Sequence, residues 1–438
     1  MSGRTKWSPG SLLVRGGRLI DPEQDLDGSY DVLIEDGLVA EVGEGVTVAA
    51  DVPVFEAEGR VVTPGLLDIH VHLREPGQEY KEDIESGTRA AVAGGFTALA
   101  CMANTDPAND TPSVTEHILK QAERFGHCRV YPVGAVSKGL AGDELAEIGE
   151  MHKAGIVAIS DDGHPIENPE LMRRALMYAQ QFDRPLVQHA QDLLLSGKGV
   201  MHEGEYSTRL GIAGIPGAAE DAMVARDILL VEDVGGRYHV QHLSTARSLE
   251  LVRQAKARGL TVTCEVTPHH LLLSDRTVFE SGLDPNTKMN PPLRSEDDRQ
   301  ALIAGLQDGT IDLIASDHAP HHPDEKELDF VDAPFGILGL ETTLPLCLDR
   351  LVGGGVVTLE RLVALLTCEP ARIMGLPGGT LAVGSPGDVT VIDTEREVVV
   401  DPNGGQSRSC NTPFAGWQLK GAAVATVVAG QVAYRAES

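Results

Sequence analysis

Eight short apolar runs, with helix-like segments between them, fill the middle of the chain and constrain its fold more than any other feature. Strand-like and helix-like patterns that alternate along a chain predict a parallel α/β architecture. Eight such units between residues 64 and 375 predict a TIM-type (β/α)8 barrel rather than an open sheet. The runs lie at residues 66–72, 96–105, 128–137, 156–163, 184–191, 237–245, 261–270 and 311–320.

Three of the segments between these runs carry clear helix signals. Residues 113–126 begin with Ser113 and Glu116 at the spacing of a capping box and end at Gly126. Residues 168–182 and 245–259 place apolar side chains at intervals of three and four residues. We therefore expect a helix in each segment.

The two ends of the chain differ from the middle, because both alternate short β-like runs with turns. The sequence Glu-Asp-Gly at residues 35–37 lies between two such runs and predicts a β-hairpin. We expect the two ends to meet in one small β-sandwich domain. The predicted domains are residues 1–63 and 376–438, which share the sandwich, and residues 64–375, which form the barrel.

Chemically reactive side chains stand where several of the predicted strands end. Active sites of such barrels are built at the carboxyl ends of the strands, so these side chains should point into one mouth. They are His70 and His72 in the first run, Asp161 and Asp162 in the fourth, His189 in the fifth, His242 in the sixth and Asp317 in the eighth.

The sequence DIHVHLREPG at residues 68–77 places His70, His72 and Arg74 on one face of a strand. Two imidazoles and a guanidinium make a poor core, and they would suit a site that binds a cation together with an anion. A single His in a strand is more often a core residue, and a single Asp there is more often a helix cap. The convergence of many such residues at strand ends favours a metal site instead.

The nature of the ligands narrows the choice of metal. Four imidazoles and two carboxylates, with no thiolate, suit Zn²⁺, although Co²⁺, Mn²⁺ or Fe²⁺ could substitute. Six ligands exceed the four of a closed structural zinc site, so two ions that share a bridging carboxylate are expected. Asp161 and Asp162 are adjacent and cannot both face the centre, and the pattern alone leaves the choice between them open.

Composition excludes several classes of function. The net charge of −29 argues against binding to nucleic acid or to anionic lipid. No apolar run approaches the roughly 18 residues that span a membrane. The six scattered cysteines contain no Cys-x-x-Cys pair, which argues against a zinc ribbon or a disulfide framework. Residues 1–17 have no apolar core of secretory length, so a cytoplasmic location is expected.

Several motifs, taken together, are more specific than the paired histidines. They are DIHVHLREPG at residues 68–77, KMNPPLR at 288–294, SDHAPH at 316–321 and PFGILGLET at 334–342. Over nearly its whole length, the chain resembles the type I dihydroorotases of the cyclic amidohydrolase superfamily. It has MANT where that family usually has MPNT and HAQD where HCED is common, and both changes leave the inferred site positions intact.

The resemblance implies a role for each site residue. His70 and His72, with Asp317, would hold one metal, and His189 and His242 would hold the second. Asp162 would bridge both, at the place where many hydantoinase-like relatives use a carboxylated lysine. The residues implied to grip the substrate carboxylate are Arg74, Asn104 and His321. Those implied to hold the pyrimidine ring are Asn290 and the backbone around Phe335 and Gly336.

The activity implied by the resemblance is the reversible cyclisation of N-carbamoyl-L-aspartate to L-dihydroorotate, a step of de novo pyrimidine biosynthesis. A hydroxide activated by the two metals would attack the ring carbonyl, and Asp317 would carry the proton. Residues 318–335 are expected to form a mobile lid.

Two alternatives to this activity stay open. One is another cyclic amidohydrolase, such as a hydantoinase or an allantoinase, and the other is a non-catalytic partner of aspartate transcarbamoylase. A homodimer and an association of the active enzyme with that transcarbamoylase also stay open.

Overall fold

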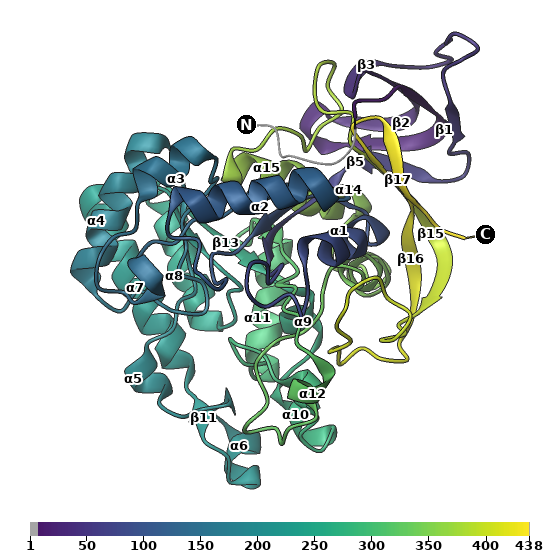
Figure 1. Ribbon diagram of the computed structural model, residues 1–438. Coiled ribbons are helices and arrows are strands. Elements are labelled where there is room, and N and C mark those ends of the chain that lie inside the picture. The colour runs from purple at the N-terminus through teal and green to yellow at the C-terminus, as the bar shows by residue number, and fades with distance from the viewer. Residues whose placement is uncertain (1–7, 438) are drawn as a thin grey trace.

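The computed structural model describes residues 8–437, and its centre is a barrel of parallel strands (Figure 1). Strands β6, β7 and β8 pair in that order, and a second group pairs in the order β14-β13-β12-β9. The barrel strands are β6 (Leu66–Val71), β7 (Phe96–Cys101), β8 (Arg129–Pro132), β9 (Leu186–Gln188), β12 (Tyr238–Val240), β13 (Val262–Val266) and β14 (Leu313–Ile314).

Short parallel bridges join the two groups of strands into a closed ring. Ile159 pairs with Gly134 on one side and with Leu186 on the other, and Val71 pairs with His318. The run at residues 156–163 therefore occupies the fourth barrel position but forms no continuous strand. The carboxylate of Asp161 accepts hydrogen bonds from the backbone N–H groups of Val136 and Ser137. At this position a side chain therefore takes the place of backbone hydrogen bonds between the neighbouring strands.

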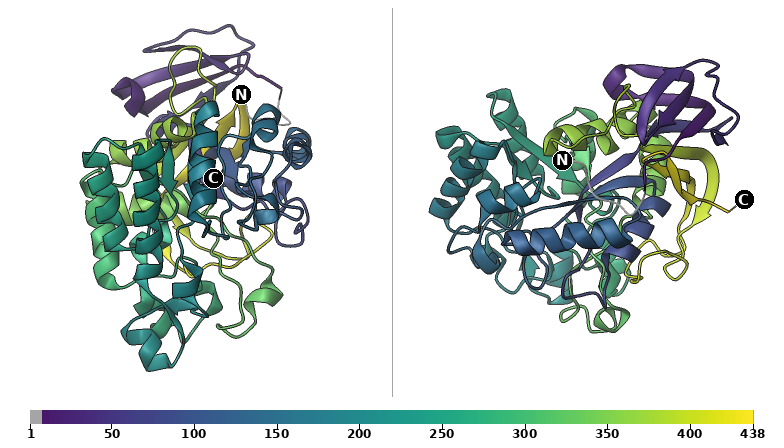
Figure 2. Two further views of the ribbon diagram at one scale, coloured as in Figure 1. Left: turned by 90° about the vertical axis from the view of Figure 1, so that its left-hand side faces the viewer. Right: turned by 45° about the horizontal axis from the view of Figure 1, so that its top comes forward.

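Helices form a layer around the barrel, as the two views of Figure 2 show. Apolar residues of α1, α2, α4, α7, α8 and α14 belong to the same buried cluster as the strand residues that they cover. The longer helices are α1 (Ile84–Ala93), α2 (Pro112–Phe125), α3 (Ile148–Ala154), α4 (Pro169–Ala179), α7 (Gly217–Val234), α8 (Ala246–Ala257), α11 (Glu296–Gln307), α14 (Leu359–Leu366) and α15 (Cys368–Met374).

Shorter elements lie mostly in the segments that connect the barrel units. They are α5 (Leu193–Ser196), α6 (Glu205–Leu210), α9 (Pro268–Leu272), α10 (Asp275–Glu280), α12 (Pro323–Lys326), α13 (Thr343–Leu346) and the strands β10 (Met201–His202) and β11 (Gly214–Ile215).

The three predicted helices exist, but one begins differently from the prediction. Helix α2 starts at Pro112 after Thr111, so the predicted capping box at Ser113 and Glu116 is wrong. Proline suits the first helical position because its ring fixes a helical φ and it has no N–H to leave unpaired. The predicted end at Gly126 is confirmed.

Strands from both ends of the chain form one sheet in the order β17-β16-β15-β5-β1-β2-β3, and β4 pairs with β1. The predicted hairpin at residues 35–37 is confirmed, because β2 and β3 pair antiparallel around Asp36 and Gly37, which both have positive φ. The strands are β1 (Leu12–Asp21), β2 (Leu26–Glu35), β3 (Leu38–Gly43), β4 (Val54–Glu56), β5 (Val61–Pro64), β15 (Val389–Val399), β16 (Gln418–Val428) and β17 (Gln431–Arg435).

The N-terminal and C-terminal strands share one apolar core, which contains residues such as Val14, Ile34 and Val427. Figure 1 shows these strands side by side at one end of the barrel. Residues 1–7 of the predicted first segment, and Ser438 of the last, lie outside the described residues, and the domain boundaries near residues 63 and 376 stay predictions. Within residues 8–437, no helix combines the length and the apolar character needed to cross a membrane.

Candidate metal centre

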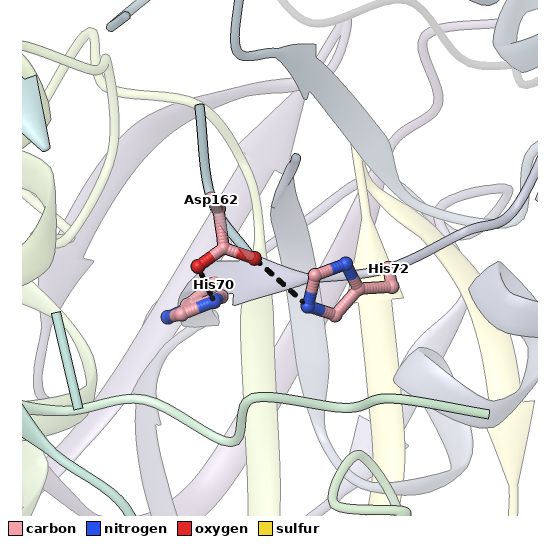
Figure 3. A group of neighbouring side chains, drawn as sticks. All are labelled: His70, His72 and Asp162. Atoms are coloured by element: carbon pink, nitrogen blue, oxygen red, sulfur yellow. Dashed lines mark ion pairs between the residues drawn. The ribbon is translucent and has the colours of Figure 1, made fainter. Parts of the chain in front are cut away.

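Asp162 lies among four imidazoles that come from three strand ends. Its Oδ1 is 3.4 Å from His70 Nε2, and its Oδ2 is 3.4 Å from His72 Nε2. Figure 3 shows one carboxylate oxygen directed at each of these two rings. Oδ1 is also 3.7 Å from His189 Nδ1 and 3.7 Å from His242 Nε2. One carboxylate therefore reaches every histidine of the predicted ligand set.

Asp317 follows β14 and faces the same group. Its Oδ1 is 3.1 Å from His72 Nε2 and 3.5 Å from His70 Nε2. Asp317, Arg74 and His242 all have positive φ, at 47°, 60° and 30°. A left-handed backbone is unfavourable for residues with a side chain, and such strain gathers at sites where the surrounding structure holds a functional geometry.

The adjacent aspartates of the fourth run have different roles. Asp162 faces the imidazoles, whereas Asp161 binds the backbone of Val136 and Ser137 and the hydroxyl of Ser137. Of the two adjacent aspartates, Asp162 is therefore the one that faces the centre. Asp161 stabilises the turn that carries Asp162.

The neighbouring imidazoles keep both central carboxylates ionised against the effect of burial. Burial by itself would raise the pKa of Asp317, but His70 and His72 lower that pKa well below its ordinary value. The pKa of Asp162 is also lowered against the effect of burial, chiefly by His70. The six residues of the centre are almost completely buried, and they are His70, His72, Asp162, His189, His242 and Asp317.

The residues present fit a divalent cation. The buried atoms Asp162 Oδ1 and His242 Nδ1 have no hydrogen-bond partner among the described residues. Potential ligand atoms lie within 4.8 Å of one another in three overlapping groups, which are His70–His72–Asp162, His70–His242–Asp317 and Asp162–His189–His242. Imidazole nitrogens and carboxylate oxygens without a thiolate form a donor set suited to such ions.

A layer of polar side chains fixes the orientation of the imidazoles. Glu265 Oε1 lies 2.5 Å from His70 Nδ1, and its Oε2 lies 3.1 Å from His239 Nε2. When Nδ1 of His70 donates to Glu265, its Nε2 is free to face the centre. The pKa of Glu265 is lowered to about 2, because His70 and His239 outweigh the effect of burial. Glu265 is therefore a carboxylate under neutral conditions.

Sequence reasoning missed Glu265, and His239, as a single histidine in a strand, was expected to be an ordinary core residue. His239 is indeed buried and hydrogen-bonded, but its partner is the carboxylate that orients His70. The available signal was an acidic residue inside the apolar run at 261–270, because an unpaired carboxylate is seldom buried.

Replacement of Glu265 by Gln should weaken metal binding. Partners that orient metal-ligating histidines typically contribute about 10- to 100-fold in metal affinity. We expect a loss of this size, measured as metal retained during dialysis against a competing chelator. Glu58→Gln is the matched control, because Glu58 is exposed in the terminal sheet domain. Equal retention by the Glu265→Gln variant and the wild type would contradict an orienting role.

Beside the metal centre lies a group that can bind an anion. Arg74 Nε donates to the carbonyl of Pro320 over 3.1 Å, and Arg74 Nη2 lies 3.4 Å from His321 Nε2. Burial lowers the pKa of Arg74 to about 10, so the guanidinium stays charged at neutral pH. Burial, followed by the cations Arg74 and Lys81, lowers the pKa of His321, so its imidazole stays neutral.

Two other predicted substrate residues, Asn104 and Asn290, contact histidines of the metal centre. Asn104 Oδ1 is 2.9 Å from His72 Nδ1, and Asn104 Nδ2 donates to the backbone carbonyl of Asp162. Asn290 Nδ2 lies 3.2 Å from His189 Nε2, and its buried Oδ1 has no partner among the described residues. That oxygen is an acceptor available to a ligand.

Gly336 packs against His321, and both of its backbone polar groups are already engaged. Its N–H donates to the carbonyl of Lys288, and its own carbonyl accepts from Asn411. A side chain on Gly336 would meet Ala319 O at 2.6 Å, so only glycine permits this approach. The ring of Phe335 lies beneath Lys288 Nζ, with 4.7 Å to the ring centroid.

Comparison with known proteins decides the family. The family model described as "Dihydro-orotase-like" matches residues 59–248, and the model of the amidohydrolase family matches residues 204–434. The dihydroorotase of Syntrophotalea carbinolica is 54% identical over 424 residues, which cover 97% of this chain and 99% of that protein. The chain belongs to the dihydroorotase family. The dihydroorotase of Anaeromyxobacter dehalogenans is 55% identical and covers 97% of this chain and 98% of that protein.

Solved structures place this dihydroorotase-family chain in the amidohydrolase fold. The L-hydantoinase of Arthrobacter aurescens is 29% identical, covers 97% of this chain and 96% of its own, and has a TM-score of 0.87. The dihydropyrimidinase of Brevibacillus agri is 22% identical, covers 97% and 95%, and has a TM-score of 0.84, which shows the fold alone. The predicted barrel with a β-sandwich domain formed by both chain ends is confirmed.

Proposed function

We propose that this chain catalyses the reversible cyclisation of N-carbamoyl-L-aspartate to L-dihydroorotate, as the name of its relatives indicates. The observation that carries the proposal is the position of Asp162, whose two oxygens face four buried imidazoles beside the cationic Arg74. Such a site places a cation-binding centre next to an anion-binding group. The substrate needs the first to polarise its carbonyl and the second to bind its carboxylate.

The substrate carboxylate would bind to Arg74, with His321 and Asn104 beside it. A guanidinium can donate two parallel hydrogen bonds to a carboxylate, and the neutral imidazole of His321 can add another without competing for charge. Asn290 Oδ1, which lacks a partner among the described residues, would accept a hydrogen bond from a ring N–H. Phe335 and the backbone of Gly336 would enclose the ring.

We propose that His70, His72 and Asp317 would hold one divalent ion, most suitably Zn²⁺, and that His189 and His242 would hold a second. Asp162 would contribute to the binding of both. When bound, such ions lower the pKa of water to near 7 and polarise a carbonyl oxygen. Asp317 Oδ2 would accept the proton of the attacking water during hydrolysis and return it to the leaving amide nitrogen. In the cyclisation direction, Asp317 would take the proton from the carbamoyl nitrogen.

Parallel assays with dihydroorotate, hydantoin and allantoin test the proposal against the other cyclic amidohydrolases. We expect dihydroorotate to be hydrolysed with kcat/KM at least 100-fold above the other two, because only dihydroorotate carries a carboxylate for Arg74; this margin is about 3 kcal/mol. Preference for hydantoin or allantoin would overturn the substrate assignment. Absence of turnover in the zinc-loaded protein would instead favour a non-catalytic partner of aspartate transcarbamoylase.

Replacement of Arg74 by Lys should raise KM for dihydroorotate. Lysine keeps the charge but loses the planar pair of donors and the contact with Pro320. Hydrogen bonds to charged groups contribute about 1.5–3 kcal/mol, which corresponds to about 10- to 100-fold in kcat/KM. Steady-state kinetics would measure the change, with Arg276→Lys on the exposed side of α10 as the control. An unchanged KM would remove Arg74 from the carboxylate site.

Some expectations stay predictions. A homodimer and a complex with aspartate transcarbamoylase are not tested by the geometry of one chain. The cytoplasmic location rests only on the sequence of residues 1–17, of which residues 1–7 lie outside the described part. The segment at 318–335, expected to be a mobile lid, carries the short helix α12 and the buried side chains of Lys326 and Phe330.

A further inference from the structure

Between β15 and β16 the chain leaves the terminal sheet and returns to the barrel. We call residues 400–417 the C-terminal loop. Ser407 binds the carboxylate of Glu82, and Ser409 donates to the carbonyl of Lys81 over 2.8 Å. These contacts bring Asn411, which is 1% exposed, beside the segments that contain His321 and Gly336.

The side chain of Asn411 binds three backbone groups of those two segments. Its Oδ1 accepts from His321 N–H over 3.0 Å. Its Nδ2 donates to Ala319 O and to Gly336 O, each over 3.0 Å. In addition, the backbone carbonyl of Asn411 accepts from Leu338 N–H over 2.9 Å. The carboxamide thus uses its acceptor and both of its donor hydrogens.

The three backbone groups that the Asn411 side chain binds require a side-chain amide at this position. One N–H and two carbonyls need one acceptor and two donors, which Asn supplies and which ionised Asp cannot. An Asp here would direct a carboxylate oxygen at two buried carbonyl oxygens. Buried polar groups left without partners are destabilising, so the isosteric change from Asn to Asp would force the two segments apart.

The position of these bonds relates them to substrate binding. Ala319 and His321 flank Pro320, whose carbonyl accepts from Arg74 Nε. Through His321 N–H, Asn411 therefore fixes the peptide unit that contains the Pro320 carbonyl, and through Ala319 O it fixes the preceding unit. It also ties the same turn to Gly336, which contacts the ring of His321.

We propose that Asn411 is a positioning residue for substrate binding, through which the C-terminal loop sets the geometry of Arg74, His321 and Gly336. The inference rests on the proposed function, because it assigns these three residues to the substrate. Asn411 itself would not touch the substrate or the metal ligands. Its loss should weaken binding of dihydroorotate while leaving the chemical step and the metal content intact.

The test compares Asn411→Asp with Asn403→Asp, which adds the same charge at an exposed position of the same loop. We expect Asn411→Asp to raise KM for dihydroorotate about tenfold or more and to change kcat less than threefold, as when ground-state and transition-state binding are lost together. Metal content should not change. Asn403→Asp should behave as the wild type.

Hydrogen exchange provides a readout that is independent of turnover. We expect the amides of Ala319, His321 and residues 336–338 to exchange about tenfold faster in Asn411→Asp, and those of the barrel strands to stay protected. Asn411→Ser removes the same bonds without a new charge, so it replaces Asn411→Asp if that variant does not fold.

Unchanged exchange or an unchanged KM would overturn the inference. A parallel collapse of kcat, metal content and thermal stability would also overturn it, because Asn411 would then be a general structural residue. A wild type that does not turn over dihydroorotate would overturn the proposed function, and the exchange data would still decide whether Asn411 fixes the two segments.

Discussion

Replacement of Asp317 by Asn is expected to lower kcat for dihydroorotate hydrolysis by about 1,000-fold or more. A positioned acid–base group contributes about 10²- to 10⁴-fold, and Asn cannot carry the proton. Asn still offers an oxygen to the centre, so most of the effect should reside in proton transfer. The pKa of Asp317, lowered by His70 and His72 against the effect of burial, keeps the wild-type carboxylate in the form that accepts a proton.

The measurement for Asp317→Asn must separate proton transfer from metal loss. Metal content per chain is therefore determined on the same preparation that is assayed. Asp324→Asn is the matched control, because Asp324 lies seven positions further along the same segment and is exposed. Turnover within a few-fold of the wild type, with metal bound, would exclude Asp317 as the proton carrier.

The barrel could be predicted because its signals are local in the sequence. An apolar run of strand length and a following helix pattern are visible within about 30 residues, and closure of the ring follows from their number. The same reasoning placed His70, Asp162 and Asp317 at one mouth, since the carboxyl ends of parallel strands gather there. His70 does lie within contact distance of both Asp162 and Asp317.

The partners of those residues could not be predicted from local signals. Glu265 pairs with His70 across 195 positions of the sequence, and Asn411 binds His321 across 90. Neither contact produces a periodic pattern in the sequence. The first depends on which strands are neighbours in the barrel, and the second depends on where the C-terminal loop packs. The start of α2 was missed for another reason, since Pro112 overrode the capping signal at Ser113.

Removal of metal is expected to abolish turnover and to lower thermal stability. The centre buries two ionised carboxylates among four imidazoles, and without a cation the atoms Asp162 Oδ1 and His242 Nδ1 lack partners among the described residues. A ligand at 1,000 times its Kd stabilises the folded state by about 4 kcal/mol. The chelated protein should therefore melt several degrees below the zinc-loaded one.

Titration of Zn²⁺ into the chelated protein should restore turnover as about two ions bind per chain, because the six ligands exceed one closed site. Asp162→Asn is the informative variant, since Asp162 is the residue that reaches all four imidazoles. It should bind fewer ions and recover less than about 1% of wild-type turnover, because it would lose the proposed ligand of both ions. Full activity after exhaustive chelation would refute a metal-dependent reaction at this centre.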